Sequence, residues 1–324
     1  VVDAPLAPGA PVPAAPHDLA APAVLLHTSG TTAAPRGVTL TFGNLLWSAL
    51  GSAVALGLDP AERWLCALPL AHVGGLSVLV RSAVCATTVL LHPRFEAEAV
   101  LADLARDATL VSLVPTTLAR LLDAGLAAPP ALRAVLLGGA PAPPALLARA
   151  AAARVPVATT YGLTEAASQV TTRGVPLFCT RVRLGADGEV LVAGPTVAPG
   201  ALAPDGWLHT GDLGALGGDG SLTIVGRAAD TIVTGGENVA PAEVEAVLAE
   251  HPAVADAAVH ARPDAEWGEA VVATVVLRPG ARADEAELRG HARARLAAFK
   301  VPRAVVFATE LPRTGSGKLL RRAL

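Results

Sequence analysis

The stretch AVLLHTSGTTAAPRGV, residues 23–38, joins a short apolar run to a loop of small, hydroxylated and glycine residues. The run 23–27 predicts a buried strand, and we expect the loop to lead into a helix over 44–57. Backbone N–H groups of such a loop come close to phosphate oxygens, and Arg36 adds a positive charge. A Gly/Thr/Pro surface loop accounts for the same residues, so this stretch alone favours neither interpretation. It does not have the order of a Walker A loop.

Outward from this stretch, short apolar runs alternate with helical patterns, and turns and strands dominate after Gly185. The expected strands are 88–91, 110–114, 134–137, 188–192 and 221–225. The expected helices are 97–106, 116–124, 242–250 and 285–298. Alternation of strands and helices favours an α/β fold with a mainly parallel sheet. The sequence therefore predicts a large N-terminal domain, 23–226, with a parallel βα sheet and a β-rich part, followed by a small α+β C-terminal domain, 227–324. Residues 1–22, rich in Ala and Pro, are expected to be a flexible lead-in.

The composition excludes several classes of protein. The chain has 324 residues, 52% hydrophobic and 16% charged, which excludes a disordered chain. Its net charge of −3 argues against a nucleic-acid partner. The cysteines, Cys66, Cys85 and Cys179, form no C-x-x-C pair, so a reducing cytosol is favoured over a zinc site or a disulfide framework. No signal-peptide pattern opens the chain. We therefore expect a cytoplasmic protein.

Two apolar stretches raise the question of a membrane span. Residues 37–58 carry no charge and are long enough to cross a bilayer, but they contain several glycine, serine and threonine residues. Residues 73–91 have Arg81 near their middle, which is costly in lipid. We predict two buried helices of an α/β core and no membrane span.

Eight motifs along the chain follow the order found in one enzyme superfamily. They are the loop 28–37, LPLAH (68–72), GGAP (138–141), YGLTE (161–165), GWLHTGDLG (206–214), GR (226–227), GGEN (235–238) and PRTGSGK (312–318). Over residues 23–324 the chain resembles the adenylate-forming superfamily of acyl-CoA synthetases, luciferases and adenylation domains. The resemblance implies that the small C-terminal domain is mobile, with a hinge at 227–230 that includes Ala229 and Asp230.

The resemblance also implies a nucleotide site. Its ATP- and AMP-binding residues would be Thr28, Ser29, Gly30, Thr31, Thr32, Arg36, Gly138, Gly139, Ala140, Tyr161, Gly162, Thr164, Asp212 and Arg227. The loop would hold the β- and γ-phosphates, and Tyr161, the only tyrosine, would lie against adenine. Asp212 and Arg227 would bind the ribose hydroxyls.

Glu165 and Tyr161 each have a structural alternative to the role that the resemblance implies. Glu165 would hold Mg²⁺, a hard cation that bridges carboxylate and phosphate oxygens, and its alternative is an exposed carboxylate at a helix start. The alternative for Tyr161 is a core tyrosine.

Lys318 is the predicted catalytic residue. Attack of a carboxylate on the α-phosphorus builds negative charge on phosphoryl oxygens, which an ammonium group stabilises. A solvated lysine near a chain end is the alternative. However, Lys300 and Lys318 are the only lysines in a chain where arginine supplies every other cation. We expect a structural or surface role for Lys300.

Residues 47–53, 72–81 and 161–170 look most like those of o-succinylbenzoate–CoA ligases of menaquinone biosynthesis. The resemblance implies substrate-binding roles for His72, Arg81, Gly139 and Ser168. His72 would be a catalytic gate between the acyl pocket and the CoA tunnel, or else a satisfied core histidine. No acid lies at helical spacing from Arg81, so it meets a substrate carboxylate or extends to the surface.

The implied activity is that of an acid–thiol ligase that uses ATP, Mg²⁺ and coenzyme A to convert a carboxylic acid first into an acyl-adenylate and then into a CoA thioester. An adenylating enzyme for another aryl or fatty acid or for a carrier protein, and a non-catalytic nucleotide-binding relative, stay open. Ala33 replaces a loop glycine and Ala229 a polar hinge residue. Family members carry a long subdomain before the phosphate loop, where this chain has the lead-in. A short natural form and a truncated chain both stay open, as does an acyl pocket completed by a second subunit in a homodimer.

Overall fold

The computed structural model describes residues 16, 18–28, 36–313 and 319–324. A seven-stranded sheet forms the centre of the N-terminal part, in the order β4-β3-β5-β6-β7-β8-β9. Its strands are β3 (Arg63–Cys66), β4 (Thr88–Leu91), β5 (Leu110–Leu113), β6 (Ala134–Leu137), β7 (Val157–Leu163), β8 (Ser168–Thr172) and β9 (Val175–Pro176). The pairs from β4 to β7 are parallel, and the pairs β7–β8 and β8–β9 are antiparallel. The expectation of a mainly parallel sheet is confirmed.

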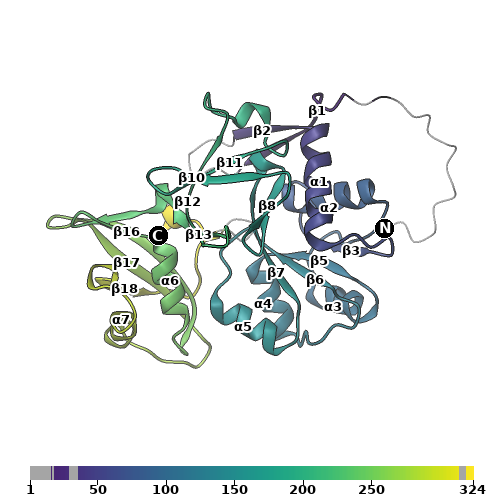
Figure 1. Ribbon diagram of the computed structural model, residues 1–324. Helices are drawn as coiled ribbons and strands as arrows, with labels where there is room; N and C mark the ends of the chain where they lie inside the picture. The colour runs from purple at the N-terminus through teal and green to yellow at the C-terminus, as the bar shows by residue number, and fades with distance from the viewer. Residues whose placement is uncertain (1–15, 17, 29–35, 314–318) are drawn as a thin grey trace.

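Helices cover both faces of this sheet (Figure 1). They are α1 (Phe42–Leu56), α2 (Val73–Cys85), α3 (Ala97–Arg106), α4 (Pro115–Asp123) and α5 (Pro144–Ala152). Alternate residues of β5 point to opposite faces: Val111 packs in the core with α3, α4 and α5, whereas Leu110 packs with Val78 of α2. Two buried faces explain why all four residues of β5 and of β6 are buried, and why β6 is a continuous apolar run rather than an alternating one.

A hairpin precedes α1 and corrects one expectation. The loop at 29–35 leads from β1 (Pro22–Thr28) into a second strand, β2 (Arg36–Thr41), and not directly into a helix. In β2, the buried Val38 and Leu40 alternate with exposed Gly37 and Thr39, which is the pattern of a strand with one covered face. Position 37 therefore belongs to a strand, and the apolar stretch 37–58 combines a strand with a helix.

The β-rich part is a four-stranded antiparallel sheet. Its strands are β10 (Arg181–Leu184), β11 (Glu189–Ala193), β12 (Leu208–Leu216) and β13 (Leu222–Arg227). Alternating residues such as Val190, Val192 and Leu222 face a core that also contains Ala166 and Val170, next to the end of β7. This core attaches the antiparallel sheet to the carboxyl end of the parallel one.

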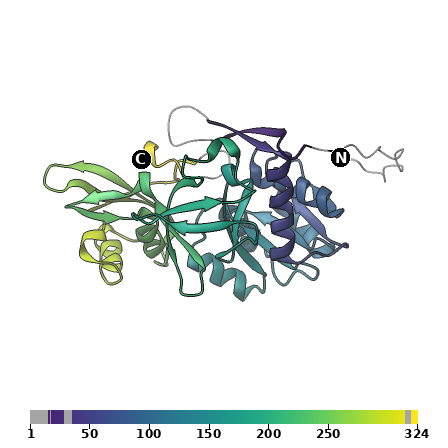
Figure 2. The same cartoon turned by 45° about the horizontal axis from the view of Figure 1, so that its top comes forward.

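The C-terminal part has its own sheet and core, at the far end of the molecule from α1 (Figure 2). Its elements are β14 (Ile232–Thr234), β15 (Glu237–Val239), α6 (Pro241–Ala249), β16 (Val254–Asp264), β17 (Gly268–Leu277), α7 (Glu285–Arg293) and β18 (Ala304–Phe307). Five 3₁₀ turns complete the described chain: η1 (Thr164–Ala166), η2 (Pro199–Ala201), η3 (Ala228–Asp230), η4 (Ala298–Lys300) and η5 (Arg321–Ala323). The expected arrangement, a large N-terminal part followed by a small α+β C-terminal part, is confirmed, whereas the boundary at 226 stays a prediction.

Two other expectations about helices need correction. The stretch 73–91 is not one helix: α2 ends at Cys85, where Ala86 adopts a left-handed conformation with φ of 53°, and the expected strand 88–91 follows as β4. Helix α7 ends at Arg293 rather than at 298; Leu296 then packs against the C-terminal core, and η4 forms ahead of Pro302. None of the helices in the described ranges is both long and apolar enough to cross a bilayer.

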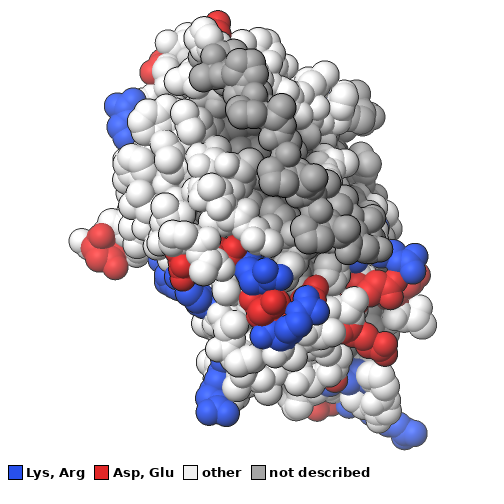
Figure 3. Space-filling view, turned by 90° about the vertical axis from the view of Figure 1, so that its right-hand side faces the viewer, with Lys and Arg blue, Asp and Glu red and all other residues white. Residues whose placement is uncertain are grey.

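The outer side of α1 is free of charge. The helix contains no Asp, Glu, Lys or Arg, and the side chain of Val54 is 67% exposed. In Figure 3 most of the charged residues of this face lie in its lower part, and a few lie along the top and the upper left edge. Apolar surface of this kind is typical of a contact area.

Candidate active site

Two of the predicted nucleotide-binding segments, 138–140 and 161–164, lie at the carboxyl ends of β6 and β7 in the parallel sheet, where α/β folds usually bind ligands. Gly138 follows β6, and a Cβ built there would lie 2.4 Å from Thr160 Oγ1, so any other residue would require the Thr160 side chain to shift. Gly139 has φ of 80°, and Gly139 and Ala140 are exposed. Their backbone is therefore accessible, and its role toward a ligand stays a prediction.

Tyr161, Asp212 and Arg227 meet although they are far apart in the sequence. The Tyr161 hydroxyl donates a hydrogen bond to Asp212 Oδ2 at 2.7 Å, and Arg227 Nε lies 2.8 Å from Asp212 Oδ1. The register of β12 and β13 places Asp212 opposite Arg227. Burial, and then the charge of Asp212, raise the pKa of Tyr161 well above its usual range, so the phenol stays a donor. The tyrosine also packs against the core of the antiparallel sheet, as its alternative role as a core residue implies, and its site role stays a prediction.

Glu165 lies in η1, directly after β7, with its side chain partly exposed. No group of three or more His, Cys, Asp or Glu residues that could hold a metal occurs in the described ranges. Mg²⁺ commonly takes one or two carboxylates and completes its shell with phosphate oxygens and water. A single carboxylate at this sheet edge therefore fits a magnesium ion that arrives with a nucleotide.

A strained turn follows η1. Ala167 and Ser168 have φ of 51° and 94°, both in the region that favours glycine. The turn is held closely: Ser48 Oγ of α1 donates to the Ala167 carbonyl at 2.6 Å. A Cβ on Gly162 would lie 1.7 Å from the Ser168 carbonyl oxygen, so β7 and the turn touch through backbone. Strain that the surroundings enforce is typical of functional sites.

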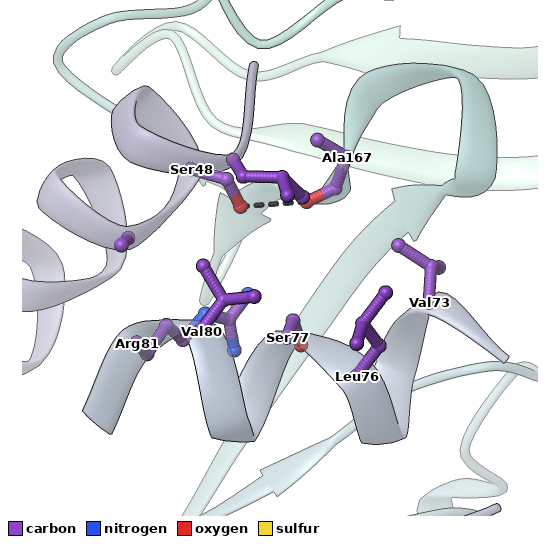
Figure 4. A pocket seen from close by; sticks show the side chains of 9 residues that line it. Ser48, Val73, Leu76, Ser77, Val80, Arg81 and Ala167 are labelled. Atoms are coloured by element: carbon purple, nitrogen blue, oxygen red, sulfur yellow. Dashed lines mark hydrogen bonds between the residues drawn. The ribbon is translucent and has the colours of Figure 1, made fainter. Parts of the chain in front are cut away.

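Arg81 lies beside this turn in a pocket between α1, α2 and η1 (Figure 4). Its side chain is 4% exposed, so the expectation that it extends to the surface is wrong. Arg81 Nη2 donates to Ser168 Oγ at 3.3 Å, and Ser168 Oγ donates to Ser77 Oγ at 3.3 Å. Burial lowers the pKa of Arg81 to about 10, so the guanidinium stays charged at neutral pH. Among the described residues it forms no ion pair with a carboxylate.

The remaining predicted residues divide into described and undescribed ones. His72 immediately precedes α2 and is exposed, so its alternative role as a core histidine is wrong. Thr28 and Arg36 are opposite each other at the end of the β1–β2 hairpin. Ser29, Gly30, Thr31, Thr32, Ala33 and Lys318 lie outside the described residues.

Comparison with known proteins identifies the family. Residues 2–202 match the AMP-binding enzyme family, and residues 243–318 match the AMP-binding enzyme C-terminal domain. The chain belongs to the AMP-binding enzymes. A 2-succinylbenzoate–CoA ligase of Bacillus licheniformis is 42% identical over 333 aligned positions, which cover 93% of this chain and 69% of the relative.

Solved structures of o-succinylbenzoate CoA synthetase from Bacillus subtilis are also similar to this AMP-binding enzyme. The complex with the acyl-adenylate intermediate OSB-AMP has a TM-score of 0.88 at 40% identity and covers 94% of this chain and 69% of its own. The complex with ATP and a magnesium ion also has a TM-score of 0.88. A double mutant bound to its product analogue OSB-NCoA, which covers 95% of this chain and 69% of its own, has a TM-score of only 0.64 at the same 40% identity.

In this AMP-binding enzyme, the predicted hinge is tied to the last described segment of the chain. Ala229 and Asp230 lie in η3, and Asp230 Oδ2 is 3.0 Å from Arg321 Nη1. Arg321 also contacts Glu245 of α6 at 2.7 Å and donates to the Val259 carbonyl at 3.1 Å. One guanidinium therefore joins the hinge, a helix and a strand.

Lys300 has the structural role expected of it. Its ammonium group lies 2.7 Å from both carboxylate oxygens of Glu243 in α6.

Three site residues were not assigned a role from the sequence. Ser48 holds Ala167, Ser77 contacts Ser168, and the Trp64 ring lies under Arg81. Ser77 and Arg81 are four residues apart, which places them on one face of α2. That spacing is visible in the sequence and is the signal that points to Ser77. For Trp64 the sequence offers no such signal, because the contact depends on how β3 and α2 pack.

Proposed function

We propose that the chain ligates a carboxylic acid to coenzyme A in two steps, through an acyl-adenylate, and that the acid is o-succinylbenzoate. One observation carries the proposal: among the described residues, Arg81 is a buried cation without a carboxylate partner, and it lies beside the turn at Ser168, which touches β7 directly after Tyr161. A buried cation of this kind needs an opposite charge, and a dicarboxylic acid supplies one while it presents its other carboxylate for activation. The names of the similar proteins support this choice of acid.

The nucleotide would lie across the carboxyl ends of β6 and β7. Asp212 and Arg227 would bind the ribose hydroxyls, and the open backbone at Gly138 and Gly139 would approach the base. Glu165 would hold Mg²⁺, which neutralises the phosphate charge when it is bound. The hairpin loop between Thr28 and Arg36 would enclose the β- and γ-phosphates.

The acid would enter the pocket between α1 and α2. Arg81 and Ser168 would bind its second carboxylate, and His72, exposed at the start of α2, would border the path of coenzyme A. The acid's other carboxylate attacks the α-phosphorus, and pyrophosphate leaves with the electrons of the broken P–O bond. Lys318 would stabilise the charge on the phosphoryl oxygens during this step.

The second step would follow rotation of residues 227–324 about the hinge at 227–230. The CoA thiolate attacks the acyl carbonyl, and AMP leaves. This chain superposes better on the adenylate complex of the Bacillus subtilis enzyme than on its product-analogue complex, as the TM-scores of 0.88 and 0.64 indicate. The difference supports an arrangement of the N- and C-terminal parts of this chain like that of the adenylation step.

Pyrophosphate exchange with a panel of acids, followed by addition of coenzyme A, tests this function. We expect exchange with o-succinylbenzoate and release of AMP with thioester formation. Exchange without a thioester would indicate a carrier-protein acceptor, and absence of exchange with every acid would indicate a nucleotide-binding protein without this activity. Lys318→Ala is expected to abolish exchange and leave thioester formation from preformed adenylate largely intact; equal loss of both steps would contradict its role.

We also propose that two copies associate through the uncharged outer side of α1, and that the protein is cytoplasmic. The exposed Val54 supports the first proposal, and the three free cysteines support the second. Light scattering on the Val54→Glu variant tests the association: a wild-type mass of one chain would contradict it.

A further inference from the structure

The guanidinium of Arg81 is held by few polar contacts for a buried cation. Among the described residues, Nη2 donates to Ser168 Oγ at 3.3 Å, and Nε has no hydrogen-bond partner. A guanidinium has five N–H donors in a fixed plane, and one long hydrogen bond does not fix that plane. Something else must hold the group in orientation.

The face of Trp64 supplies that support. The guanidinium carbon of Arg81 lies 5.5 Å from the centre of the Trp64 ring, within the range of a cation–π contact. Both side chains are buried, so water does not screen the attraction. A second small cavity, lined by Ser52, Trp64, Arg81 and Cys85, lies next to this contact.

Trp64 is itself rigidly placed. It lies in β3, between the parallel neighbours β4 and β5, and is 5% exposed. Its indole N–H donates to Ser112 Oγ of β5 at 3.2 Å, which fixes the rotation of the ring. A ring held by a central strand is a more exact support than one held by a loop.

We propose that Trp64 is a positioning residue for acid recognition: its indole face holds the Arg81 guanidinium beside Ser168 and so gives the enzyme its preference for an acid with a second carboxylate. This inference rests on the proposed function. Without the ring, the guanidinium would turn toward the cavity beside Ser52, and the second carboxylate would lose its partner.

The test compares two acids in pyrophosphate exchange: o-succinylbenzoate and 4-oxo-4-phenylbutanoate, which lacks the second carboxylate. We expect Trp64→Leu to raise the KM for o-succinylbenzoate by roughly 30-fold, which is the effect of losing a desolvated cation–π contact. The kcat, the ATP KM and the kcat/KM for 4-oxo-4-phenylbutanoate should stay close to wild type. Trp64→Phe should lie between, because a phenyl face attracts a cation less strongly.

Two further variants make the test decisive. Ser112→Ala removes the hydrogen bond of the indole and nothing from the pocket, and it should raise the KM for o-succinylbenzoate about twofold to threefold. Trp267→Leu is the matched control, because Arg303 lies over that ring at 4.3 Å in the C-terminal part, and it should change neither acid. Equal losses for both acids in the Trp64 variants, or folded Trp64→Leu protein with unchanged selectivity, would overturn the inference.

Arg81→Gln separates this inference from the proposed function. If Arg81→Gln leaves the preference between the two acids unchanged, the carboxylate role of Arg81 fails, and this inference fails with it. If Arg81→Gln removes the preference but Trp64→Leu keeps it, only the role of Trp64 fails.

Discussion

A single carboxylate organises the nucleotide end of the candidate site. Asp212 accepts a hydrogen bond from Tyr161 on one oxygen and faces Arg227 with the other, and it is 6% exposed. Because both partners depend on its charge and position, removal of the charge should loosen both at once.

We expect Asp212→Asn to raise the KM for ATP by roughly 10- to 100-fold, the usual effect of losing hydrogen bonds to a charged group. The KM for the acid should change little, because Arg81 and Ser168 are unaffected. Asp219→Asn is the control, since that carboxylate caps an exposed turn at Ser221. An unchanged ATP KM in steady-state kinetics would contradict the role of Asp212.

Gly162 tests how closely β7 and the strained turn fit. An alanine Cβ would lie 1.7 Å from the Ser168 carbonyl oxygen, which is too close without a backbone shift. We expect Gly162→Ala to lower the free energy of unfolding by about 3 kcal/mol or more. Gly290→Ala, in α7 with open space around it, should be neutral or stabilising by about 0.5–1 kcal/mol. Equal stability of the two variants in urea unfolding would show that the turn yields freely.

The residue types of the site were predictable from the sequence, whereas their contacts were not. Tyr161, Asp212 and Arg227 were expected in one site, but the register that places Asp212 opposite Arg227 depends on an irregularity in the pairing of β12 and β13. The burial of Arg81 was left open, because the same apolar helix could face solvent or core. Only the packing of α2 on Trp64 decides it.

At the scale of elements, α1 is fixed at its first turn. Thr41 Oγ1 accepts from the Asn44 N–H at 3.1 Å, and Asn44 Oδ1 accepts from the Thr41 N–H at 2.9 Å. Asn44 Nδ2 also donates to the carbonyls of Pro195 and Val197 at 2.8 and 2.9 Å. Asn44 therefore caps a helix and joins it to the segment that follows β11.

Substitutions in this cap should differ in effect. Thr41→Ala removes one capping bond and is expected to cost about 1 kcal/mol. Asn44→Asp keeps the shape but directs a carboxylate at two carbonyls, of which that of Val197 is in a buried contact, so it should cost at least about 2 kcal/mol more. Asp284→Ala removes the corresponding cap of α7 and is the control. Chemical unfolding measures the free energy of unfolding of all three variants. If Asn44→Asp is no less stable than Thr41→Ala, the contacts of Asn44 with Pro195 and Val197 contribute nothing to stability.

The elements that periodicity predicted mostly have ends within a residue or two, because buried parallel strands such as Ala134–Leu137 are short apolar runs between turn residues. Helix α5 and the strands after β13 were not predicted. The exceptions have physical causes. Strand β2 forms because it pairs with β1. In the sequence, the alternation over 36–41 is too short to be distinguished from the helical pattern that follows it.

At the scale of the whole molecule, two separate cores predict two unfolding transitions. The C-terminal core extends from Ile232 to Val305 and shares no residue with the others. Chains with independent cores commonly depart from two-state unfolding. We expect calorimetry to show two transitions, with Trp267 fluorescence identifying the C-terminal one.

The C-terminal transition should depend on pH through His291. Burial lowers the pKa of His291, whose Nε2 lies 3.0 Å from the Val247 carbonyl. Between its folded and unfolded pKa values the unfolded chain binds more protons, so stability is present above the unfolded value, about 6.5, and declines as pH falls below it. We expect the Tm of this transition to decrease between pH 7.5 and 5.5, and His291→Gln to reduce the decrease.

His209 should act in the opposite direction on the N-terminal part. Its hydrogen bond with Glu189 raises the pKa of His209, so its contribution is present at low pH and disappears as pH rises through the folded value. Because the side chain is exposed, we expect the effect of His209 to be small.

The two histidines are told apart by the transition that each affects. A Tm of the C-terminal transition that does not change with pH would contradict the assignment to His291.

The strained turn at Ala167 and Ser168 has a consequence for how such an enzyme can evolve. A residue with a side chain in the left-handed region costs about 1–2 kcal/mol of stability relative to glycine. Positions 167 and 168 nevertheless carry alanine and serine, so the protein has kept this cost. A laboratory selection for heat resistance alone would thus be expected to enrich glycine at 167 and 168. The selected variants would have a more flexible turn beside Arg81. Substitutions at these two positions would therefore raise thermal stability and lower selectivity for the acid.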